Sequence, residues 1–251
     1  MNTPIAIVTG GNRGLGKDMV QKLAARGVAV IFTYRGNKAE ADGVVSELQA
    51  AGGRIAALQL NVGDTSQYDA FAKETRAVLA GWGADRFNFL VNNAGVGIHA
   101  PFAETTEAQF DQLMNVHFRG VFFLTQKLLP LIADGGRIIN ISSGLARFSM
   151  PGMSAYSSMK GAIEVLTRYL AKELGSRGIA VNTIAPGAIE TDFGGGTVRD
   201  NRETNSFVAS VTALGRAGKP EDIGGVVASL LAPENAWING QRIEVSGGML
   251  L

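Results

Sequence analysis

The sequence predicts a doubly wound α/β fold, in which a parallel sheet of about seven strands carries helices on both faces. Short apolar, β-branched runs alternate with longer segments of helical periodicity along the whole chain, a pattern typical of parallel sheets. Glycine supplies 33 of the 251 residues and often follows an apolar run, as tight strand–helix turns require. Because no linker, repeat or low-complexity tract interrupts the chain, we predict a single domain over residues 1–251.

The apolar runs predict the strands, and the segments between them repeat apolar residues at helical spacing. We expect strands at residues 5–9, 28–34, 55–60, 87–91, 137–141, 179–184 and 242–245. The second helix should end at Gly52, a natural C-terminal stop, and the third should begin after the capping side chain of Asp64. The later helical patterns cover residues 106–132, 154–172 and 221–231.

One segment has no clear period. Residues 193–206 (FGGGTVRDNRETNS) are polar and contain glycine. The segment is either an irregular surface loop or a mobile lid. We favour the lid, because the segment follows the carboxyl end of a strand, where such sheets bind ligands.

The composition excludes several classes of function. Lys plus Arg is 23 and Asp plus Glu is 22, so the formal charge of +1 gives no support for a nucleic-acid partner. The chain has no cysteine and only two histidines, His99 and His117, outside any ligand cluster, so we expect no metal site. The N-terminus lacks the basic and apolar regions of a secretory signal, and no run is long enough to span a membrane. We therefore expect a cytoplasmic protein.

A glycine-rich turn follows the first predicted strand and opens a helix. It reads T9-G10-G11-N12-R13-G14-L15-G16. Glycines here permit a sharp turn and let the backbone approach a pyrophosphate at the helix N-terminus. The same turn could also be purely structural, but its strand–turn–helix context favours a dinucleotide.

The residues after the second predicted strand indicate which dinucleotide. NAD-binding chains carry an acidic residue at this place for the ribose hydroxyl, whereas this chain has Tyr34 and Arg35, with no acid until Glu40. A guanidinium suits a 2′-phosphate, and Arg13 could reach the same region. We therefore predict NADP(H) in preference to NAD(H), unless both arginines simply face solvent.

Tyr156 and Lys160 lie four residues apart on the predicted helix at residues 154–172, so they share one face. A free phenol, with a pKa of about 10, is a poor acid or base near neutral pH. One positive charge about 5 Å away, at an effective dielectric of about 20, favours the phenolate by roughly 3 kcal/mol, or about two pKa units. Such a pair can exchange a proton with a substrate oxygen, although an isolated Y-x-x-x-K also occurs on ordinary helices.

Further motifs appear in a fixed order along the chain. They are the NNAG run at residues 92–95, Asn115 in the long helical pattern, Ser143 thirteen residues before Tyr156, and Pro186 and Gly187 with Thr191 beyond them. Together with the glycine turn and Y156-S-S-M-K160, they resemble the short-chain dehydrogenases/reductases in their common single-domain form, which has a Rossmann-type sheet. The resemblance covers essentially the whole chain.

The resemblance implies a catalytic role for four residues. Tyr156 would exchange a proton with the substrate oxygen, and Lys160 would lower the pKa of that tyrosine and hold the nicotinamide ribose. Ser143 would stabilise the substrate oxygen, and Asn115 would hold a water that links Lys160 to solvent. Ser142 also follows the fifth strand, but the thirteen-residue spacing favours Ser143.

The resemblance also implies a cofactor site. Its expected residues are Gly10, Asn12, Arg13, Gly14, Leu15, Gly16, Tyr34, Arg35, Asn61, Val62, Asn93, Ala94, Gly95, Tyr156, Lys160, Pro186, Gly187, Ile189 and Thr191. Two positions depart from the family pattern, since Asn61 and Ser246 each stand where the family often has an aspartate. An amide can still hydrogen-bond an adenine edge, so we expect binding to persist.

We therefore predict an NADPH-dependent reductase of a ketone, reversible as a secondary-alcohol dehydrogenase. The alternatives are an NAD-linked alcohol dehydrogenase and a non-catalytic dinucleotide sensor. We expect a small-molecule carbonyl or alcohol as the substrate, no nucleic-acid or membrane partner, and a homotetramer or homodimer. The loops at residues 97–103, 144–153 and 189–214 should select the substrate. In and beside these loops, Arg147, Arg199 and Arg202 could bind an acidic group of the substrate or have no such role. Phe148, Met150 and Met153 could line an apolar wall of the substrate pocket or pack elsewhere. His99 could border the pocket or have only a packing role.

Overall fold

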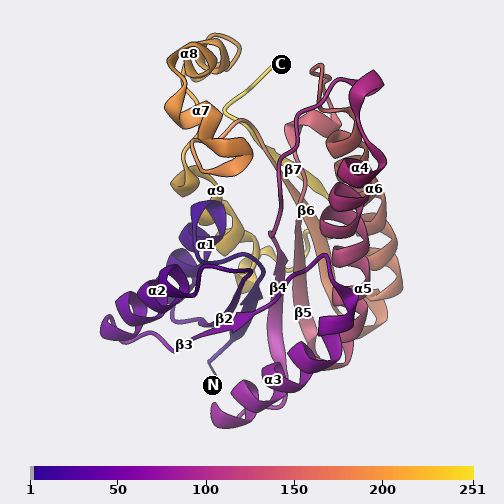
Figure 1. The fold of residues 1–251 in the computed structure, drawn as a ribbon. Coiled ribbons are helices and arrows are strands. Elements are labelled where there is room, and N and C mark those ends of the chain that lie inside the picture. The colour runs from indigo at the N-terminus through magenta and orange to yellow at the C-terminus, as the bar shows by residue number, and fades with distance from the viewer. Residues whose placement is uncertain (1–2) are drawn as a thin grey trace.

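Short runs, most of them apolar and buried, form the central sheet of the computed structural model, which describes residues 3–251. Its seven strands are β1 (Ile5–Val8), β2 (Ala29–Tyr34), β3 (Ile55–Gln59), β4 (Phe87–Asn92), β5 (Ile132–Ile141), β6 (Ala180–Pro186) and β7 (Arg242–Val245). All neighbours are parallel, in the order β3-β2-β1-β4-β5-β6-β7 (Figure 1). The predicted fold class is confirmed. Residues 1–2, part of the segment in which we predict no secretory signal, lie outside the described residues.

The strand order reverses at β1. This strand pairs with β2 on one side and with β4 on the other, so the chain builds the sheet outward in both directions from it. In open parallel sheets, ligands bind at such a switch point, outside the carboxyl ends of the strands. The glycine-rich turn lies directly after β1, at this point.

Two helical layers cover the sheet, one on each face (Figure 1). One layer holds α1 (Gly14–Ala25), α2 (Lys38–Ala50) and α9 (Pro220–Leu230), and the other holds α3 (Tyr68–Gly81), α4 (Glu107–Met114), α5 (Gly120–Leu128) and α6 (Ser154–Glu173). Each layer closes its own hydrophobic core: Met19 and Leu23 of α1 pack on one side, and Phe71 of α3 and Leu128 of α5 on the other.

The predicted continuous helix at residues 106–132 is interrupted. A capping box at Thr106 starts α4, a π-helix at Asn115–Arg119 separates α4 from α5, and a 3₁₀ turn ends the stretch at Leu131. The expected end of the helix at residue 132 is wrong, because Ile132 already belongs to β5 and pairs with Phe87. Pro130 lies in the 3₁₀ turn and has no N–H to continue an α-helix.

The segment at residues 193–206 is helical and not irregular. Gly194, Gly195 and Gly196 have positive φ angles and bend the chain, after which α7 (Thr197–Asp200) and α8 (Arg202–Ser210) form. The side chain of Asn201 accepts a hydrogen bond from the Thr204 amide and so caps α8. Figure 1 shows both helices standing beyond the carboxyl ends of the strands.

Within residues 3–251, no helix combines the length and apolar character needed to cross a bilayer.

Candidate active site

The glycine turn is tied to two strands by backbone and side-chain hydrogen bonds. The amide of Gly10 donates to the Thr33 hydroxyl (3.0 Å) and the amide of Gly11 to the Thr33 carbonyl (2.8 Å). The Asn93 side chain, just after β4, donates to the carbonyls of Thr9 (2.9 Å) and Gly10 (3.2 Å). These bonds hold the turn between β2 and β4 at the switch point of the sheet.

Glycine is required sterically in this turn. A β-carbon at Gly16 would lie 2.0 Å from the Gly10 carbonyl oxygen, and one at Gly11 would lie 2.5 Å from Cβ of Phe32. Gly10 itself has a φ of 68°, and its β-carbon would lie 3.1 Å from Cα of Ala94. The chain therefore passes through this point only as bare backbone.

The start of α1 fits an anion. Its N-cap residue, Arg13, makes no capping side-chain hydrogen bond, and the first turn, which includes Gly14, Leu15 and Gly16, contains no acidic residue. The first N–H groups of a helix have no intrahelical acceptor, and the helix dipole favours negative charge at this end. These residues therefore suit the pyrophosphate of a dinucleotide.

The residues expected to select NADP differ in their exposure and in their polar partners. Tyr34 ends β2 and is buried, whereas Arg35 is exposed and forms no ion pair with any residue that the structure describes. Arg13 instead faces Asp192, with 3.8 Å between Nη1 and Oδ2. Asn12 donates to the Glu40 carboxylate (2.7 Å). The corner beyond β2 therefore offers one unpaired guanidinium, that of Arg35.

The segments after β3 and β6 also lie at the carboxyl edge of the sheet. Asn61 accepts a hydrogen bond from the Gly63 amide (3.1 Å), and the Val62 carbonyl accepts one from the Tyr68 hydroxyl (2.6 Å). After β6, Gly187 donates to the Val245 carbonyl (3.1 Å); a β-carbon there would be 2.9 Å from Cα of Ser246. Of the expected cofactor residues in this part of the chain, Pro186 ends β6, Ile189 bridges to Gly218, and Thr191 lies 3.6 Å from where a β-carbon at Gly14 would stand.

Tyr156 and Lys160 lie together on the buried side of α6. The Lys160 Nζ lies 5.5 Å from the centroid of the tyrosine ring and donates to the Ile141 carbonyl at the end of β5 (2.7 Å). Tyr156 is 6% exposed and Lys160 5%, so the pair has a low-dielectric surrounding in which charge interactions are strong.

Burial dominates the protonation of both groups. It raises the pKa of Tyr156, which a hydrogen bond with Ser143 lowers in part, and it lowers the pKa of Lys160 to about 7. The pKa of Tyr156 is thus shifted upward, whereas the sequence led us to expect a downward shift. The physical reason is that desolvation disfavours the charged form of both side chains at once, which a bare Coulomb argument omits.

The two serines after β5 have different partners. The Ser142 hydroxyl donates to Glu164 (2.7 Å) and lies 3.3 Å from the Lys160 carbonyl, so it is engaged within the protein. The Ser143 hydroxyl accepts from the Leu145 amide (3.2 Å) and is the nearby polar group that lowers the pKa of Tyr156 in part. The structure thus places Ser143, as expected, beside the tyrosine.

Asn115 lies at the start of the π-helix (Asn115–Arg119). Its Cβ is 3.8 Å from where a β-carbon at Gly63 would stand, and its carbonyl accepts the Gly120 amide at the end of the π-helix. His117 contacts Tyr156, with ring centroids 5.1 Å apart.

Sequence reasoning missed His117, although a signal was present. Buried positions of this helical stretch recur at Leu113, Val116, Gly120 and Leu124, and His117 falls within the same stripe. An ionisable side chain at a buried position next to a catalytic candidate is itself a candidate functional residue.

Comparison with known proteins agrees with this geometry. The family model described as Enoyl-(Acyl carrier protein) reductase matches residues 10–250. The short chain dehydrogenase/reductase AacuN of Aspergillus aculeatus is 35% identical over 254 residues, which cover 97% of this chain and 94% of that protein. The chain belongs to the short-chain dehydrogenase/reductase family. It is therefore an oxidoreductase of the NAD(P)-dependent class.

Two solved structures of this family are similar over nearly the whole chain. The promiscuous reductase LugOII, which catalyses keto-reduction at C1 during lugdunomycin biosynthesis, is 36% identical with a TM-score of 0.94, covering 100% of this chain and 99% of that one. The angucycline C-6 ketoreductase LanV, solved with bound NADP, is 33% identical with a TM-score of 0.93, covering 99% and 96%.

Apolar side chains surround the tyrosine of this short-chain dehydrogenase/reductase. Phe193, at the start of the helical segment after β6, packs on Tyr156 with 5.7 Å between ring centroids, and Met153 joins the same cluster. His99 and Met150 line an adjoining hollow of about 400 Å³. Apolar side chains therefore border the ring of Tyr156 on this side.

Two of the three arginines near the expected substrate loops are engaged within the chain. Arg147 binds both carboxylate oxygens of Glu244 (2.7 and 2.8 Å) and donates to the carbonyls of Met249 and Leu250 (2.9 and 3.0 Å). Arg199 pairs with Asp192 and Asp200. Neither guanidinium is available to an acidic substrate without breaking these bonds, and Arg202 starts α8 as an exposed residue.

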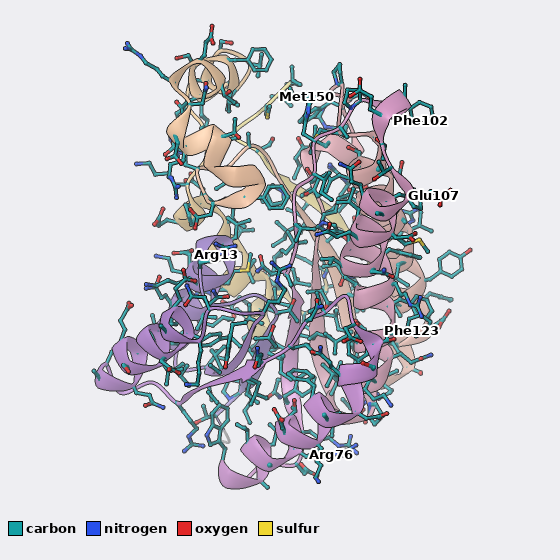
Figure 2. All side chains as sticks on the ribbon, viewed as in Figure 1. Arg13, Arg76, Phe102, Glu107, Phe123 and Met150 are labelled. Carbon is teal, nitrogen blue, oxygen red and sulfur yellow. The ribbon has the colours of Figure 1, made fainter. Side chains whose placement is uncertain are left out.

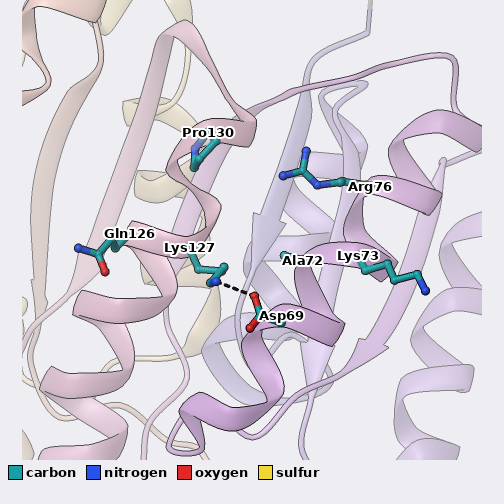
Figure 3. Close-up of a pocket in the computed structure, with 7 residues that line it drawn as sticks. All are labelled: Asp69, Ala72, Lys73, Arg76, Gln126, Lys127 and Pro130. Atoms are coloured by element: carbon teal, nitrogen blue, oxygen red, sulfur yellow. Dashed lines mark hydrogen bonds and ion pairs between the residues drawn. The ribbon is translucent and has the colours of Figure 1, made fainter.

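A second hollow, of about 500 Å³, lies between α3 and α5. Figure 3 shows its polar lining, with the Lys127–Asp69 ion pair (2.6 Å) at its centre and Arg76 beside it. It shares no residue with the predicted site.

Proposed function

We propose that the protein is an NADPH-dependent reductase of a ketone, reversible as a secondary-alcohol dehydrogenase. The observation that carries this proposal is the buried Ser143–Tyr156–Lys160 group at the carboxyl edge of the sheet. A chain of contacts links it to the glycine turn: Gly10 approaches Ala94, and Gly95 approaches His117, which packs on Tyr156. The keto-reduction by LugOII and the NADP bound to LanV support the same class.

The chain's own residues supply position, charge and the proton. NADPH, when bound, supplies the hydride. The Ser143 hydroxyl donates a hydrogen bond to the carbonyl oxygen of the substrate and stabilises the negative charge that develops there. Tyr156 gives that oxygen its proton, and a protonated Lys160 favours the phenolate that remains. Phe193 and Met153 pack against the tyrosine and make its surroundings less polar.

Reduction of a carbonyl fits this group better than reduction of a carbon–carbon double bond. The Ser143 hydroxyl lies near enough to the Tyr156 hydroxyl to lower the pKa of the tyrosine, so one acceptor atom can receive a hydrogen bond from each of the two hydroxyls. That atom matches a carbonyl oxygen, whereas an alkene requires its proton at carbon.

The first test is a turnover assay with a panel of ketones, sugars, 3-oxoacyl thioesters and enoyl thioesters, run in parallel with NADPH and NADH. We expect NADPH to be oxidised with at least one ketone and with no enoyl thioester. Turnover only with NADH and an alcohol in the oxidative direction would favour the NAD-linked dehydrogenase. Nucleotide binding with no turnover of any compound would favour a dinucleotide sensor.

Arg35→Asp should reverse the cofactor preference. The exposed guanidinium is the charge best placed for a 2′-phosphate, and an aspartate there repels that phosphate and accepts a hydrogen bond from a ribose hydroxyl. We expect the ratio of kcat/KM for NADPH to that for NADH to fall by roughly 10- to 100-fold, since one charged hydrogen bond contributes about 1.5–3 kcal/mol. Arg86→Asp makes the same charge change before β4, at the opposite edge of the sheet, and should leave the ratio unchanged. An unaltered ratio in Arg35→Asp contradicts the assignment.

We expect the chain to assemble into a homotetramer or homodimer in the cytoplasm. The helices of one layer expose large apolar side chains, which are Phe110, Met114, Phe122, Phe123, Val165 and Tyr169. Figure 2 shows Phe123 on the outer side of that layer. Exposed apolar groups gathered on one face support burial against another copy.

A further inference from the structure

Four charged side chains of alternating sign form a row that the proposed mechanism leaves unused. They are Glu164 of α6, Arg242 and Glu244 of β7, and Arg147 of the segment after β5. The Arg242 guanidinium donates to Glu164 through Nε (2.7 Å) and to Glu244 through Nη1 (2.9 Å). Arg147 in turn donates to both carboxylate oxygens of Glu244 (2.7 and 2.8 Å). We call these four residues the charge row.

The centre of the charge row is largely shielded from solvent. The exposed fractions of the side chains are 14% for Glu164, 24% for Arg242 and 20% for Glu244. Hydrogen bonds, first of all from Arg147, lower the pKa of Glu244 to about 2, so this carboxylate is ionised near neutral pH. A buried ion pair is weak evidence of stabilisation, because desolvation offsets much of the attraction. The charge row therefore requires an explanation other than stability.

The charge row contacts the segment that carries the catalytic serine at three points. The Ser142 hydroxyl donates to Glu164 (2.7 Å). Nη2 of Arg242 lies 3.4 Å from the carbonyl oxygen of Ser143, and Arg147 follows Ser143 by four residues. The charge row thus holds the main chain at Ser143 and on both sides of it without using the Ser143 hydroxyl.

Ser246 also joins the charge row. Its hydroxyl donates to Glu244 (3.0 Å) and accepts a hydrogen bond from the Met249 amide (3.3 Å). This is one of the two positions where the family often has an aspartate. An ionised aspartate has no proton to donate and would add a second negative charge beside Glu244. A serine at position 246 therefore fits a chain that carries Glu244.

We propose that Arg242 is a positioning residue that acts through Ser143. Its guanidinium links Glu164 of α6 to Glu244 of β7 and holds the carbonyl of Ser143 between them. Because Glu164 lies on the same helix as Tyr156, the charge row sets the serine in place relative to the tyrosine. This inference rests on the proposed function for its catalytic meaning. A displacement of about 1 Å in such a site can cost roughly 10²-fold in rate.

Two substitutions of Arg242 separate its geometry from its charge. Arg242→Met keeps the apolar stem and removes the guanidinium. Arg242→Lys keeps the charge, but its single nitrogen cannot reach Glu164, Glu244 and Ser143 in the geometry of a planar fork. We expect the Met variant to lower kcat for ketone reduction by roughly 10- to 100-fold with NADPH affinity unchanged, and the Lys variant to recover only part of kcat. A Met variant with the kcat of the unsubstituted protein overturns the proposal.

A double-mutant cycle with Ser143→Ala tests whether the effect passes through the serine. In single-turnover reduction, we expect Arg242→Met to lower the rate by less than about 3-fold once the Ser143 hydroxyl is absent, because residues that act as a unit are not additive. A merely structural role predicts the same fold-loss in both backgrounds. Equal losses therefore overturn the proposal.

Arg177→Met is the matched control for a lost arginine. The Arg177 side chain is 30% exposed and pairs with Asp134 (2.7 Å), and it donates to the Leu129 carbonyl (3.1 Å). It lies before β6, at the opposite edge of the sheet from Ser143. We expect Arg177→Met to lower Tm about as much as Arg242→Met and to keep full kcat. Equal losses of kcat in the two variants contradict a specific role of Arg242.

Hydrogen exchange distinguishes this inference from the proposed function, because it needs no turnover. The Ala146 amide donates to the Ser143 carbonyl (3.1 Å), and the amides of Arg147 and Phe148 donate to the Gly144 carbonyl (2.8 and 3.2 Å). We expect these three amides to exchange faster in Arg242→Met, and the amides of β1 to exchange as before. Unchanged exchange at residues 146–148 overturns the proposal. If exchange is faster while the unsubstituted protein reduces no ketone, the proposed function fails and the structural link stands.

Discussion

Tyr156→Phe should abolish ketone reduction and leave the nucleotide site intact. The substitution removes only the phenolic hydroxyl of Tyr156. In the proposed mechanism, this hydroxyl donates the proton to the substrate oxygen. Loss of a positioned general acid costs roughly 10²- to 10⁴-fold in kcat. The phenylalanine ring keeps the contacts with His117 and Phe193, so the fold and NADPH binding should persist.

The measurement is single-turnover and steady-state reduction of the best ketone, with NADPH affinity followed by cofactor fluorescence. Tyr169→Phe is the control, because Tyr169 lies on the same helix but is 64% exposed and should keep full activity. Equal turnover in Tyr156→Phe and the unsubstituted protein would refute the mechanism. A loss of NADPH binding in parallel would show that the tyrosine acts on the cofactor and not as the acid.

Gly16→Ala should disable the cofactor turn and destabilise the protein. The new β-carbon would lie 2.0 Å from the Gly10 carbonyl oxygen and 2.6 Å from Nδ2 of Asn93. The first is backbone, so the turn must move away from β4 and give up bonds from Asn93. Overpacking of this kind costs about 1–3 kcal/mol of unfolding free energy. We expect NADPH affinity to fall by roughly 10-fold or more, because each 1.4 kcal/mol of lost binding is tenfold.

Chemical denaturation and NADPH titration measure the two effects separately. Gly43→Ala is the control: Gly43 lies in α2, and a β-carbon there meets no atom within 4 Å. Alanine is the better helix former by about 1 kcal/mol, so this variant should be as stable as the unsubstituted protein or more so. If Gly16→Ala binds NADPH normally, the close approach of backbone at this turn does not matter for the cofactor.

Local patterns in the sequence were enough for the fold and for the shared helix face of Tyr156 and Lys160. The alternation of apolar runs and helical periods predicted all seven strands, although β5 begins at Ile132 and not at residue 137. The spacing of Tyr156 and Lys160 predicted a shared face, because helix geometry alone decides it. The glycines of the first turn were predicted to permit a sharp turn and the approach of a pyrophosphate, and the structure adds that the chain's own atoms leave no room there for a β-carbon.

Other features depend on contacts between distant parts of the chain. A helical pattern does not reveal a π-turn, and the packing of the π-helix on α6 places His117 beside the tyrosine. Arg147 looked free in the sequence, yet Glu244, nearly a hundred residues later, binds it. The helices α7 and α8 carried too few apolar residues to be recognised, although Asn201 supplies a local cap.

The sequence by itself determined the order of strands and helices, the bare-backbone turn after β1, and the pairing of a phenol with an amine. The tertiary structure decided how those two groups titrate and which neighbours contact them. The reason is physical: periodicity and spacing act through neighbouring residues, whereas desolvation depends on everything that surrounds a side chain. Burial raises the pKa of Tyr156 and lowers that of Lys160, and that burial exists only once β5, α6 and the π-helix have come together.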